Sequence, residues 1–199
     1  GGGIYTDNST VVLNNIIVND NEADGAGAGC YMKNGNSTIT NSIISGNRLF
    51  EGNSSDGGGL FLGTGSYILQ NVQILNNYAF DTGGGIRVDG SSATAELSKV
   101  SITDNVALQG GGFAITNNAT VIINQVTITG NYAVNGGHGG GLYLNDPQSV
   151  SVINSIIYSN PPGSFYLYTS SPKPDVNYSN IQGGREGTGN IDADPLFNE

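Results

Sequence analysis

The stretch GGGLFLGTGSYILQNVQILNN, residues 57–77, opens with a glycine triplet and closes with Asn77, and both features recur along the chain. Glycine-led segments of the same form begin at residues 1, 27, 57, 83, 110 and 139, at intervals of 26 to 30 residues. The closing residue recurs, also at intervals of 26 to 30, as Asn21, Asn47, Asn77, Asn105, Asn131 and Asn160. Two independent markers that keep the same period identify an internal repeat.

Within each unit, apolar side chains alternate between two faces. Leu60 and Leu62 share one face while Phe61 points to the other, and Val100 and Ile102 pair in the same way. A unit of about 27 residues made of short strands cannot bury its own apolar face, so stacked units must supply the core. The pattern therefore predicts an all-β parallel solenoid of about seven rungs, with roughly 27 residues per rung and rungs about 4.8 Å apart.

The repeat also predicts how a single domain is organised. Residues 1–160 hold six rungs, and residues 161–199 hold a last irregular rung and a C-terminal cap, because PPG at 161–163 interrupts the sixth unit. The closing DADPLF (192–197) is expected to fold back over the open rung as a hydrophobic cap formed by Leu196 and Phe197. Since Gly1 begins directly on a rung, we expect the chain to be a fragment of a longer one.

Stacked rungs place equivalent residues in columns. One inward column is Ile4, Cys30, Leu60, Ile86, Phe113 and Leu142, and another is Val18, Ile44, Ile74, Ile102, Ile128 and Ile157. Cys30 is the only cysteine, so we interpret it as a small core residue rather than half of an internal disulfide. The glycine triplets are expected to mark a turn that needs positive φ.

Two further columns are rich in amides. The closing asparagines form one of them, and we interpret it as a structural ladder in which each amide donates to one neighbouring rung and accepts from the other. A similar ladder is expected of the second column, which is Asn15, Asn41, Asn71, Lys99, Gln125 and Asn154.

Charge is scarce and mostly negative. The chain has 16 acidic and 6 basic residues, a net charge of −10, which argues against a nucleic-acid partner. No apolar run approaches the roughly 18 residues of a membrane-spanning helix. Low charge with abundant Gly, Asn, Ser and Thr is typical of extracellular all-β proteins, so we expect the protein to lie outside the cell or on its surface.

The repeats carry a resemblance to known proteins. GGGLYL (139–144) followed by VINSIIYSN (152–160), and the equivalent segments of the other units, resemble right-handed parallel β-helix proteins of the pectate-lyase-like superfamily and the repeats of polymorphic outer-membrane-protein adhesins. The tail VNYSNIQGGREGTGNIDADPLF (176–197) resembles the end of the β-helix in choice-of-anchor Q domain proteins. The resemblance implies a right-handed solenoid that is secreted or surface-anchored. It also makes polysaccharide lyase or hydrolase activity an alternative function, because many right-handed β-helices have such activity.

The outward side of the glycine-led strands is the candidate ligand-binding face. Its aromatic and charged residues are Tyr5, Tyr31, Lys33, Phe61, Arg87, Asp89 and Tyr143. Aromatic faces with a few charges suit sugar binding, and Arg87 is expected to lie over the ring of Phe61. Asp7 is expected to pair with Lys33. The alternative is an aromatic stack that only covers a sheet face, with ordinary surface ion pairs.

A second candidate site lies in the turns before the triplets. If Asp56 and Asp81 stack on neighbouring rungs, a Ca²⁺ ion could relieve their repulsion. Their offsets from the triplet differ, so separate solvated acids are favoured, and no other cofactor is predicted. His138 lies in an equivalent turn and is interpreted as a solvated loop residue without a column partner, next to an outward-facing Tyr143.

No catalytic set converges in these columns. The leading hypothesis is therefore a non-enzymatic β-helix, secreted or on the cell surface, that serves as a structural, adhesive or glycan-contacting module. The expected partners are glycans, or further copies of the same chain that stack end to end into fibres. The alternative is a polysaccharide lyase or glycoside hydrolase that acts along the exposed aromatic face, in which loss of Lys33 or Arg87 would abolish turnover.

Overall fold

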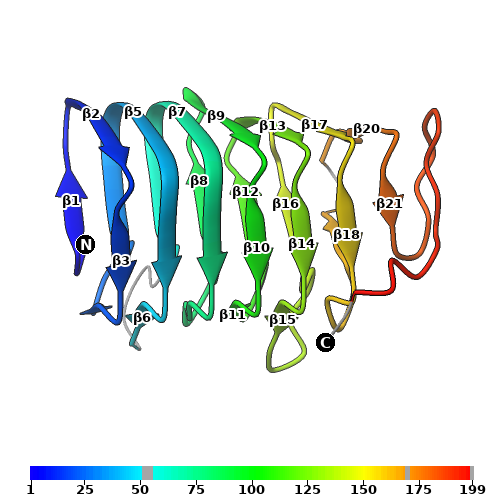
Figure 1. Ribbon diagram of the computed structural model, residues 1–199, viewed down its shortest axis with the longest axis horizontal. Coiled ribbons are helices and arrows are strands. Elements are labelled where there is room, and N and C mark those ends of the chain that lie inside the picture. Colours follow the sequence, from blue (N-terminus) through cyan, green and yellow to red (C-terminus); the bar gives the residue numbers. More distant parts are fainter. Residues whose placement is uncertain (51–55, 169–170, 198–199) are drawn as a thin grey trace.

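The computed structural model describes residues 1–50, 56–168 and 171–197, and within these ranges it contains strands and turns but no helix. The strands stack in parallel register as a solenoid, whose turns follow one another along the long axis of the molecule (Figure 1). The all-β parallel solenoid predicted from the repeat is confirmed. The described chain contains no helix that is long and apolar enough to span a membrane.

Each turn contributes a strand to three sheet faces. The glycine-led first face is β1 (Ile4–Thr6), the start of β5 (Cys30–Ser45), the start of β7 (Leu60–Leu75), β8 (Ile86–Asp89), β12 (Phe113–Thr116), β16 (Leu142–Asn145) and β19 (Phe165–Leu167). The second face is β2 (Ser9–Asn14), the middle of β5 and β7, β9 (Ala93–Ser98), β13 (Thr120–Asn124), β17 (Ser149–Ile153) and β20 (Asp175–Asn177). The third face is β3 (Ile17–Asn19), the ends of β5 and β7, β10 (Ser101–Thr103), β14 (Thr127–Thr129), β18 (Ile156–Tyr158) and β21 (Asn180–Ile181).

Short strands follow the third face in four turns, and these are β4 (Glu22–Ala23), β6 (Arg48–Leu49), β11 (Val106–Ala107) and β15 (Tyr132–Ala133). Seven strands line the first face in the described chain, from β1 to β19, so the solenoid makes six turns between them.

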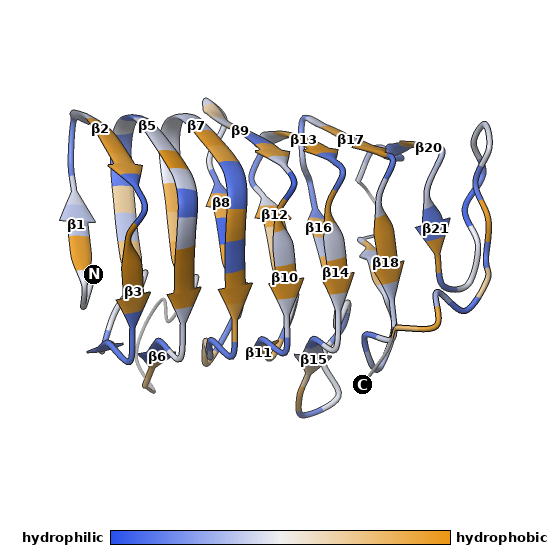
Figure 2. Cartoon of the chain, in the orientation of Figure 1, coloured by the Kyte–Doolittle hydropathy of each residue, from blue (hydrophilic) through white to orange (hydrophobic). Residues whose placement is uncertain are grey.

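The core consists of the predicted inward columns. Parallel register joins Ile4 to Cys30, Cys30 to Leu60, and so on to Leu142, and the column from Val18 to Ile157 is in register in the same way. Figure 2 shows these apolar residues as bands that cross neighbouring strands. Cys30 is fully buried among them, and burial raises the pKa of its thiol to about 12. Cys30 therefore behaves as a core residue, as predicted.

The closing asparagines form a continuous hydrogen-bonded ladder. In each step the backbone N–H and the Nδ2 of one asparagine both donate to the Oδ1 of the next, at 2.8 to 3.1 Å, from Asn21 to Asn160. Nδ2 of Asn77 also donates to the carbonyl of Ile44 in the preceding turn, at 3.0 Å. From Asn47 onward the ladder is buried, so every polar atom that it uses needs a partner.

The second amide column has a different role from the one we predicted. All six of its residues, including Lys99 and Gln125, have φ between 51° and 56°, the left-handed conformation that turns the chain between the second and third faces. Amide-to-amide bonding within the column joins Asn71 to Asn41 at 2.8 Å, whereas Asn41 and Asn154 bond to residues of a neighbouring column. Backbone conformation, which asparagine tolerates well, therefore explains this column better than a ladder does.

The glycine triplets meet two structural requirements, a positive φ and close packing between rungs. The first glycine of the triplet has positive φ, for example 68° at Gly57 and 67° at Gly83, as predicted. The third glycine lies against the ladder, and a Cβ on Gly85 would stand 2.6 Å from the carbonyl oxygen of Gly112 and 3.0 Å from Nδ2 of Asn105. The triplet therefore allows a left-handed turn and close contact between successive rungs.

The C-terminal tail covers the seventh rung, but not by the predicted hydrophobic cap. The tail after β21 lies along the end of the solenoid (Figure 1) and joins it through hydrogen bonds such as Ser179 N–H to Asn190 Oδ1 at 3.0 Å and Ile181 N–H to Ile191 O at 3.0 Å. Leu196 and Phe197 are 78% and 45% exposed. The expectation that these two side chains seal the core is wrong, because hydrogen bonds to the edge of the rung hold the tail instead.

Candidate functional site

The candidate ligand face is the outward side of the first sheet face. Its central column is in register as predicted, and the seventh turn adds one residue, so that the column is Tyr5, Tyr31, Phe61, Arg87, Ala114, Tyr143 and Tyr166. Tyr166 was not predicted from the sequence, because its turn lacks the glycine triplet that identifies the other six. The strand sequence FYL (165–167), with its alternation of ring and apolar side chain, was the available signal.

At the N-terminal end of this face, three rings form an edge-to-face series. The centroids of Tyr5 and Tyr31 are 5.4 Å apart and those of Tyr31 and Phe61 are 4.9 Å apart, with interplanar angles of 75° and 77°. The guanidinium of Arg87 lies 5.8 Å from the centroid of Phe61, as predicted. Tyr5 is 54% exposed, whereas Tyr31 and Phe61 are partly buried, so the series offers ring edges and faces to solvent.

At the C-terminal end, three rings stack in parallel. Tyr166 lies over Tyr143 with centroids 5.5 Å apart and an interplanar angle of 4°, and His138 lies over Tyr166 at 4.3 Å and 5°. Tyr143 lies in the outward column, as predicted, but it is only 5% exposed because Tyr166 stacks against it, and its role in ligand binding stays a prediction. His138 is exposed, as predicted, but it has a ring partner, which the sequence analysis did not foresee.

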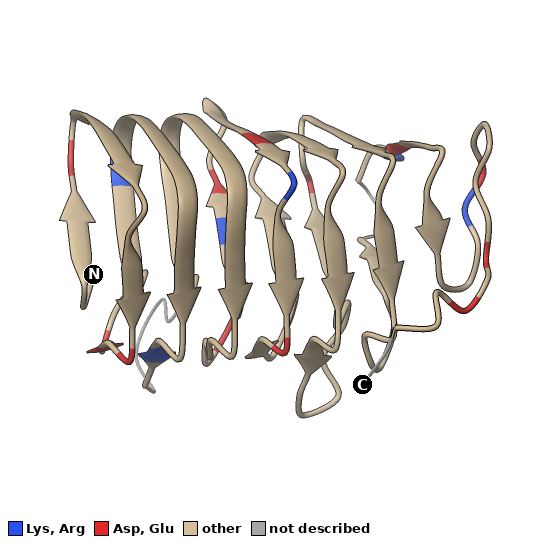
Figure 3. Cartoon of the chain, in the orientation of Figure 1, with Lys and Arg blue, Asp and Glu red and all other residues tan. Residues whose placement is uncertain are grey.

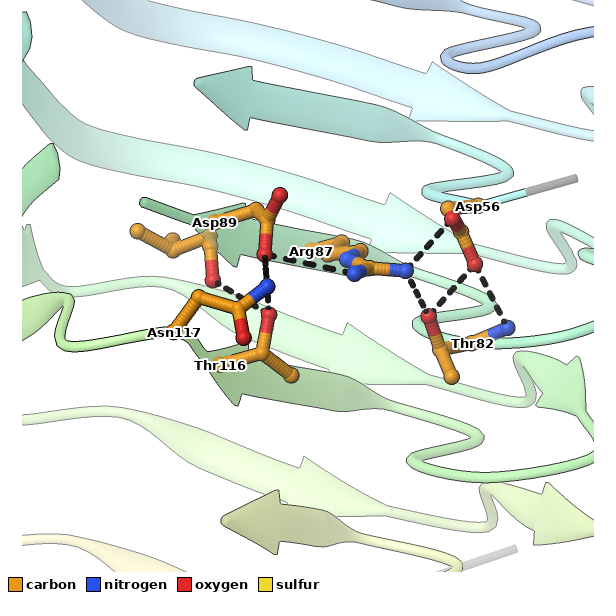
Figure 4. Close-up of polar contacts among 7 residues, drawn as sticks. Asp56, Thr82, Arg87, Asp89, Thr116 and Asn117 are labelled. Atoms are coloured by element: carbon orange, nitrogen blue, oxygen red, sulfur yellow. Dashed lines mark hydrogen bonds and ion pairs between the residues drawn. The ribbon is translucent and has the colours of Figure 1, made fainter. Parts of the chain in front are cut away.

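Between the two ring clusters, Arg87 is held by an acid from the preceding turn. Its Nη1 forms an ion pair with Asp56 Oδ2 at 2.5 Å and donates to Thr82 Oγ1 at 2.6 Å (Figure 4). Thr82 in turn donates to Asp56 Oδ1 from Oγ1 at 2.6 Å and from its N–H at 3.2 Å. The side chains of Arg87 and Asp56 are 14% and 8% exposed, so most of this contact is shielded from water.

A second acid holds the other side of the guanidinium. Arg87 Nη2 lies 3.2 Å from Asp89 Oδ1, and the same oxygen accepts hydrogen bonds from Thr116 Oγ1 and Asn117 Nδ2, each at 2.6 Å (Figure 4). The network thus joins residues of three successive turns. Arg87 Nε is the exception, since it is buried and has no hydrogen-bond partner. We call this network, Asp56, Thr82, Arg87, Asp89, Thr116 and Asn117, the Arg87 network.

Comparison with known families agrees with the fold. The family profile described as "Right handed beta helix region" matches residues 1–140 and again residues 53–192. The chain belongs to the right-handed β-helix family. Two overlapping matches to one profile are expected of a periodic chain, because the profile fits in more than one register. No curated protein and no solved structure matches the chain.

The carboxyl groups on this β-helix face differ in pKa. Burial raises the pKa of Asp81 above its usual 3.8, with a further contribution from the charge of Asp56 that Arg87 partly offsets. Burial acts in the same direction on Asp89, but the hydrogen bond from Thr116, the charge of Arg87 and the hydrogen bond from Asn117 outweigh it and lower the pKa. At Asp7 the hydrogen bond from Asn34 lowers the pKa, and Lys33 at 3.5 Å adds to the effect.

The two acids proposed for Ca²⁺ have unequal surroundings in this β-helix. Both oxygens of Asp56 are used by Arg87 and Thr82, which occupy the positions where a cation would be held. Asp81 lies near enough to Asp56 for the charge of Asp56 to raise its pKa. Within the described ranges, no three His, Cys, Asp or Glu side chains gather as a metal site would require. A shared Ca²⁺ ion stays a prediction, and Arg87 already supplies the positive charge beside Asp56.

Proposed function

We propose that this β-helix is an extracellular or cell-surface module that contacts glycans along its aromatic face and does not turn them over. The observation that carries the proposal is the column of rings at rung spacing, with Tyr5, Tyr31 and Phe61 partly exposed and held in fixed contact. Sugar rings present C–H faces that pack on aromatic side chains, and hydroxyls that bond to neighbouring polar groups. Asp7 and Lys33 lie beside the rings and supply such groups.

A rigid solenoid suits this role. The Asn ladder, the Arg87 network and the ring contacts fix the side chains before any ligand arrives, which reduces the entropy lost on binding. An extended row of contacts also matches an extended polymer better than a small molecule. The same surface serves an adhesive or structural module, since both roles need many weak contacts with a repetitive partner.

End-to-end association into fibres receives less support. A second copy that stacked on the C-terminal rung would have to displace the tail residues that bond to Ser179 and Ile181. We therefore place the contact with a partner on the side of the solenoid. Size-exclusion chromatography over a range of concentrations tests this, and growth of the particle with concentration would revive the fibre hypothesis.

One observation favours a hydrolase as the second candidate. Burial and the charge of nearby Asp56 raise the pKa of Asp81, whereas Asp56 pairs with Arg87, so two neighbouring carboxyl groups have different surroundings, as the two carboxyl groups of a glycosidase do. A screen against polygalacturonate, alginate and neutral plant glycans separates the two functions. Reducing ends or unsaturated products that form with wild type but not with Asp81→Asn or Arg87→Ala would replace our proposal with the enzyme.

Binding is tested with matched tyrosine variants. We expect Tyr31→Ala to weaken the binding of an oligosaccharide by about 1 kcal/mol, or roughly fivefold in Kd, because one stacking platform is lost. Tyr132→Ala is the control, since Tyr132 is 46% exposed but lies on β15, outside the first face. An equal loss in both variants, or no glycan binding by the wild-type protein, would contradict the proposed site.

A further inference from the structure

The charges on the candidate face are unevenly matched. Four acids, Asp7, Asp56, Asp81 and Asp89, lie on or beside the ring column, together with two cations, Lys33 and Arg87. Each cation already has an acidic partner, since Lys33 pairs with Asp7 at 3.5 Å and Arg87 pairs with both Asp56 and Asp89. The face therefore has a net negative charge, in keeping with the net charge of −10 of the chain (Figure 3).

Arg87 cannot easily serve an acidic ligand. Its two terminal nitrogens are used by Asp56, Thr82 and Asp89, its Nε is buried, and its side chain is only 14% exposed. A ligand carboxylate would have to displace one of these acids, which would then lose its own partner. Lys33, at 50% exposed, is the more accessible cation, but Asp7 accompanies it.

Asp81 adds a charge that no cation on the face matches directly. Asp81 lies close enough to Asp56 for that carboxylate to add to the effect of burial on its pKa, and Arg87, which is shared between Asp56 and Asp89, offsets this only in part. A ligand carboxylate in the same place would meet the same repulsion. A neutral sugar would not, because its hydroxyls can donate hydrogen bonds to these carboxylates while its C–H faces pack on the rings.

We infer that the aromatic face selects neutral glycans and rejects polymers of uronic acids, because the acids of the face outnumber its cations and already occupy them. This inference rests on the proposed function and names the class of ligand for the same site. Selection by repulsion needs no additional contact with the preferred ligand.

The test uses one polymer in two charge states. Polygalacturonate and the same preparation after reduction of its carboxyl groups to primary alcohols have the same linkage and length but differ in charge. Binding of each to the wild-type protein is measured by calorimetry in EDTA, at low and at physiological ionic strength. We expect the reduced polymer to bind at least about tenfold more tightly at low ionic strength, and the difference to narrow as salt screens the repulsion.

Charge variants connect the selectivity to the face. Asp81→Asn should narrow the difference in affinity between the two polymers. Glu96→Gln, which removes one charge from the exposed side of β9 on the second face, should leave that difference unchanged. Equal or tighter binding of polygalacturonate would overturn the inference and leave the proposed function standing. Failure of both polymers and of a panel of other neutral glycans would instead contradict the proposed function.

Discussion

Asn77 donates two hydrogen bonds to a single atom, the Oδ1 of Asn105, one from its backbone N–H and one from Nδ2, both at 2.9 Å. Asn105 repeats the arrangement toward Asn131, with both distances 3.0 Å. Each asparagine therefore satisfies a buried main-chain donor of the turn before it and depends on the turn after it. Such buried and fully partnered amides join successive rungs in addition to the apolar columns.

Replacing a central member of the ladder should be costly. Asn105→Ala removes the acceptor of the backbone N–H of Asn77 and one of the two acceptors of its Nδ2, which keeps the carbonyl of Ile44. The buried N–H is left without a partner, so we expect the free energy of unfolding to fall by about 2–4 kcal/mol. Urea denaturation followed by circular dichroism measures the change. Asn124→Ala is the control, because the Oδ1 of Asn124 accepts one exposed bond, from Asn154 at 3.1 Å. Similar losses in the two variants would contradict the ladder's role.

The Arg87 network should contribute more to stability than the exposed pair between Lys33 and Asp7. Arg87→Ala leaves Asp56 mostly shielded from water and without a cation, and we expect a loss of about 3 kcal/mol, at the lower end for a buried pair. Lys33→Ala should change stability little, since the Lys33 side chain is 50% exposed and that of Asp7 is 31% exposed. Adding Asp56→Asn to Arg87→Ala should restore part of the loss. Thermal melting of the four proteins completes the comparison, and a double variant no more stable than Arg87→Ala would count against the pair.

Stability should depend on pH in opposite ways through Asp81 and Asp89. The pKa of Asp81 is higher in the folded protein than its usual 3.8. The stability that comes from protonating Asp81 is therefore fully present at a pH below 3.8 and is lost as the pH rises through the folded pKa. Asp81→Asn should therefore be more stable than wild type at neutral pH, with the advantage vanishing below about pH 4.

Asp89 has a lowered pKa, so its contribution is present above its usual value of 3.8 and is lost as the pH falls through the folded pKa. Asp89→Asn should be less stable than wild type at neutral pH, and the two should converge in acid. Chemical denaturation between pH 3 and pH 7, read as the difference from wild type, tests both variants. A difference that is constant across this range would contradict either assignment.

Two glycine-to-alanine changes should have opposite effects. Gly85→Ala would place a Cβ 2.6 Å from the carbonyl oxygen of Gly112, so the rungs must separate, and we expect a loss of at least about 2 kcal/mol. A Cβ on Gly25 would meet nothing within 4 Å, and Gly25→Ala should stabilise the fold by about 0.5 kcal/mol, by restricting the unfolded chain. Melting temperatures that fall by similar amounts in both variants would refute the close approach of the rungs.

The sequence was sufficient to predict the rungs but not every contact between side chains. The columns that contain Ile4, Val18 and Asn21 follow directly from the period, because one register applies to every turn. Residues in the turns are less constrained: their offsets from the triplet differ, so spacing did not indicate that Asp56 would meet Arg87. Tyr166 was missed because its turn lacks the markers, and the burial of Tyr143 and the stacking of His138 follow from the position of Tyr166.

The glycine triplets and the ladder asparagines also show where the length of a turn can vary in this fold. The number of residues from the start of a glycine triplet to the ladder asparagine is nearly constant, as from Gly27 to Asn47 and from Gly110 to Asn131. The segment from a ladder asparagine to the next triplet differs in length between turns: residues 106–109 are the shortest example and residues 48–56 the longest. Asp56, Thr82 and His138 all lie at the end of such a segment, beside the ring column. One rim of the protein can therefore vary in length from turn to turn, as long as each segment keeps its hydrogen bonds to the neighbouring turns, such as Leu49 N–H to Tyr78 O at 2.9 Å. This modularity lets a β-helix acquire a new specificity while it keeps the same frame.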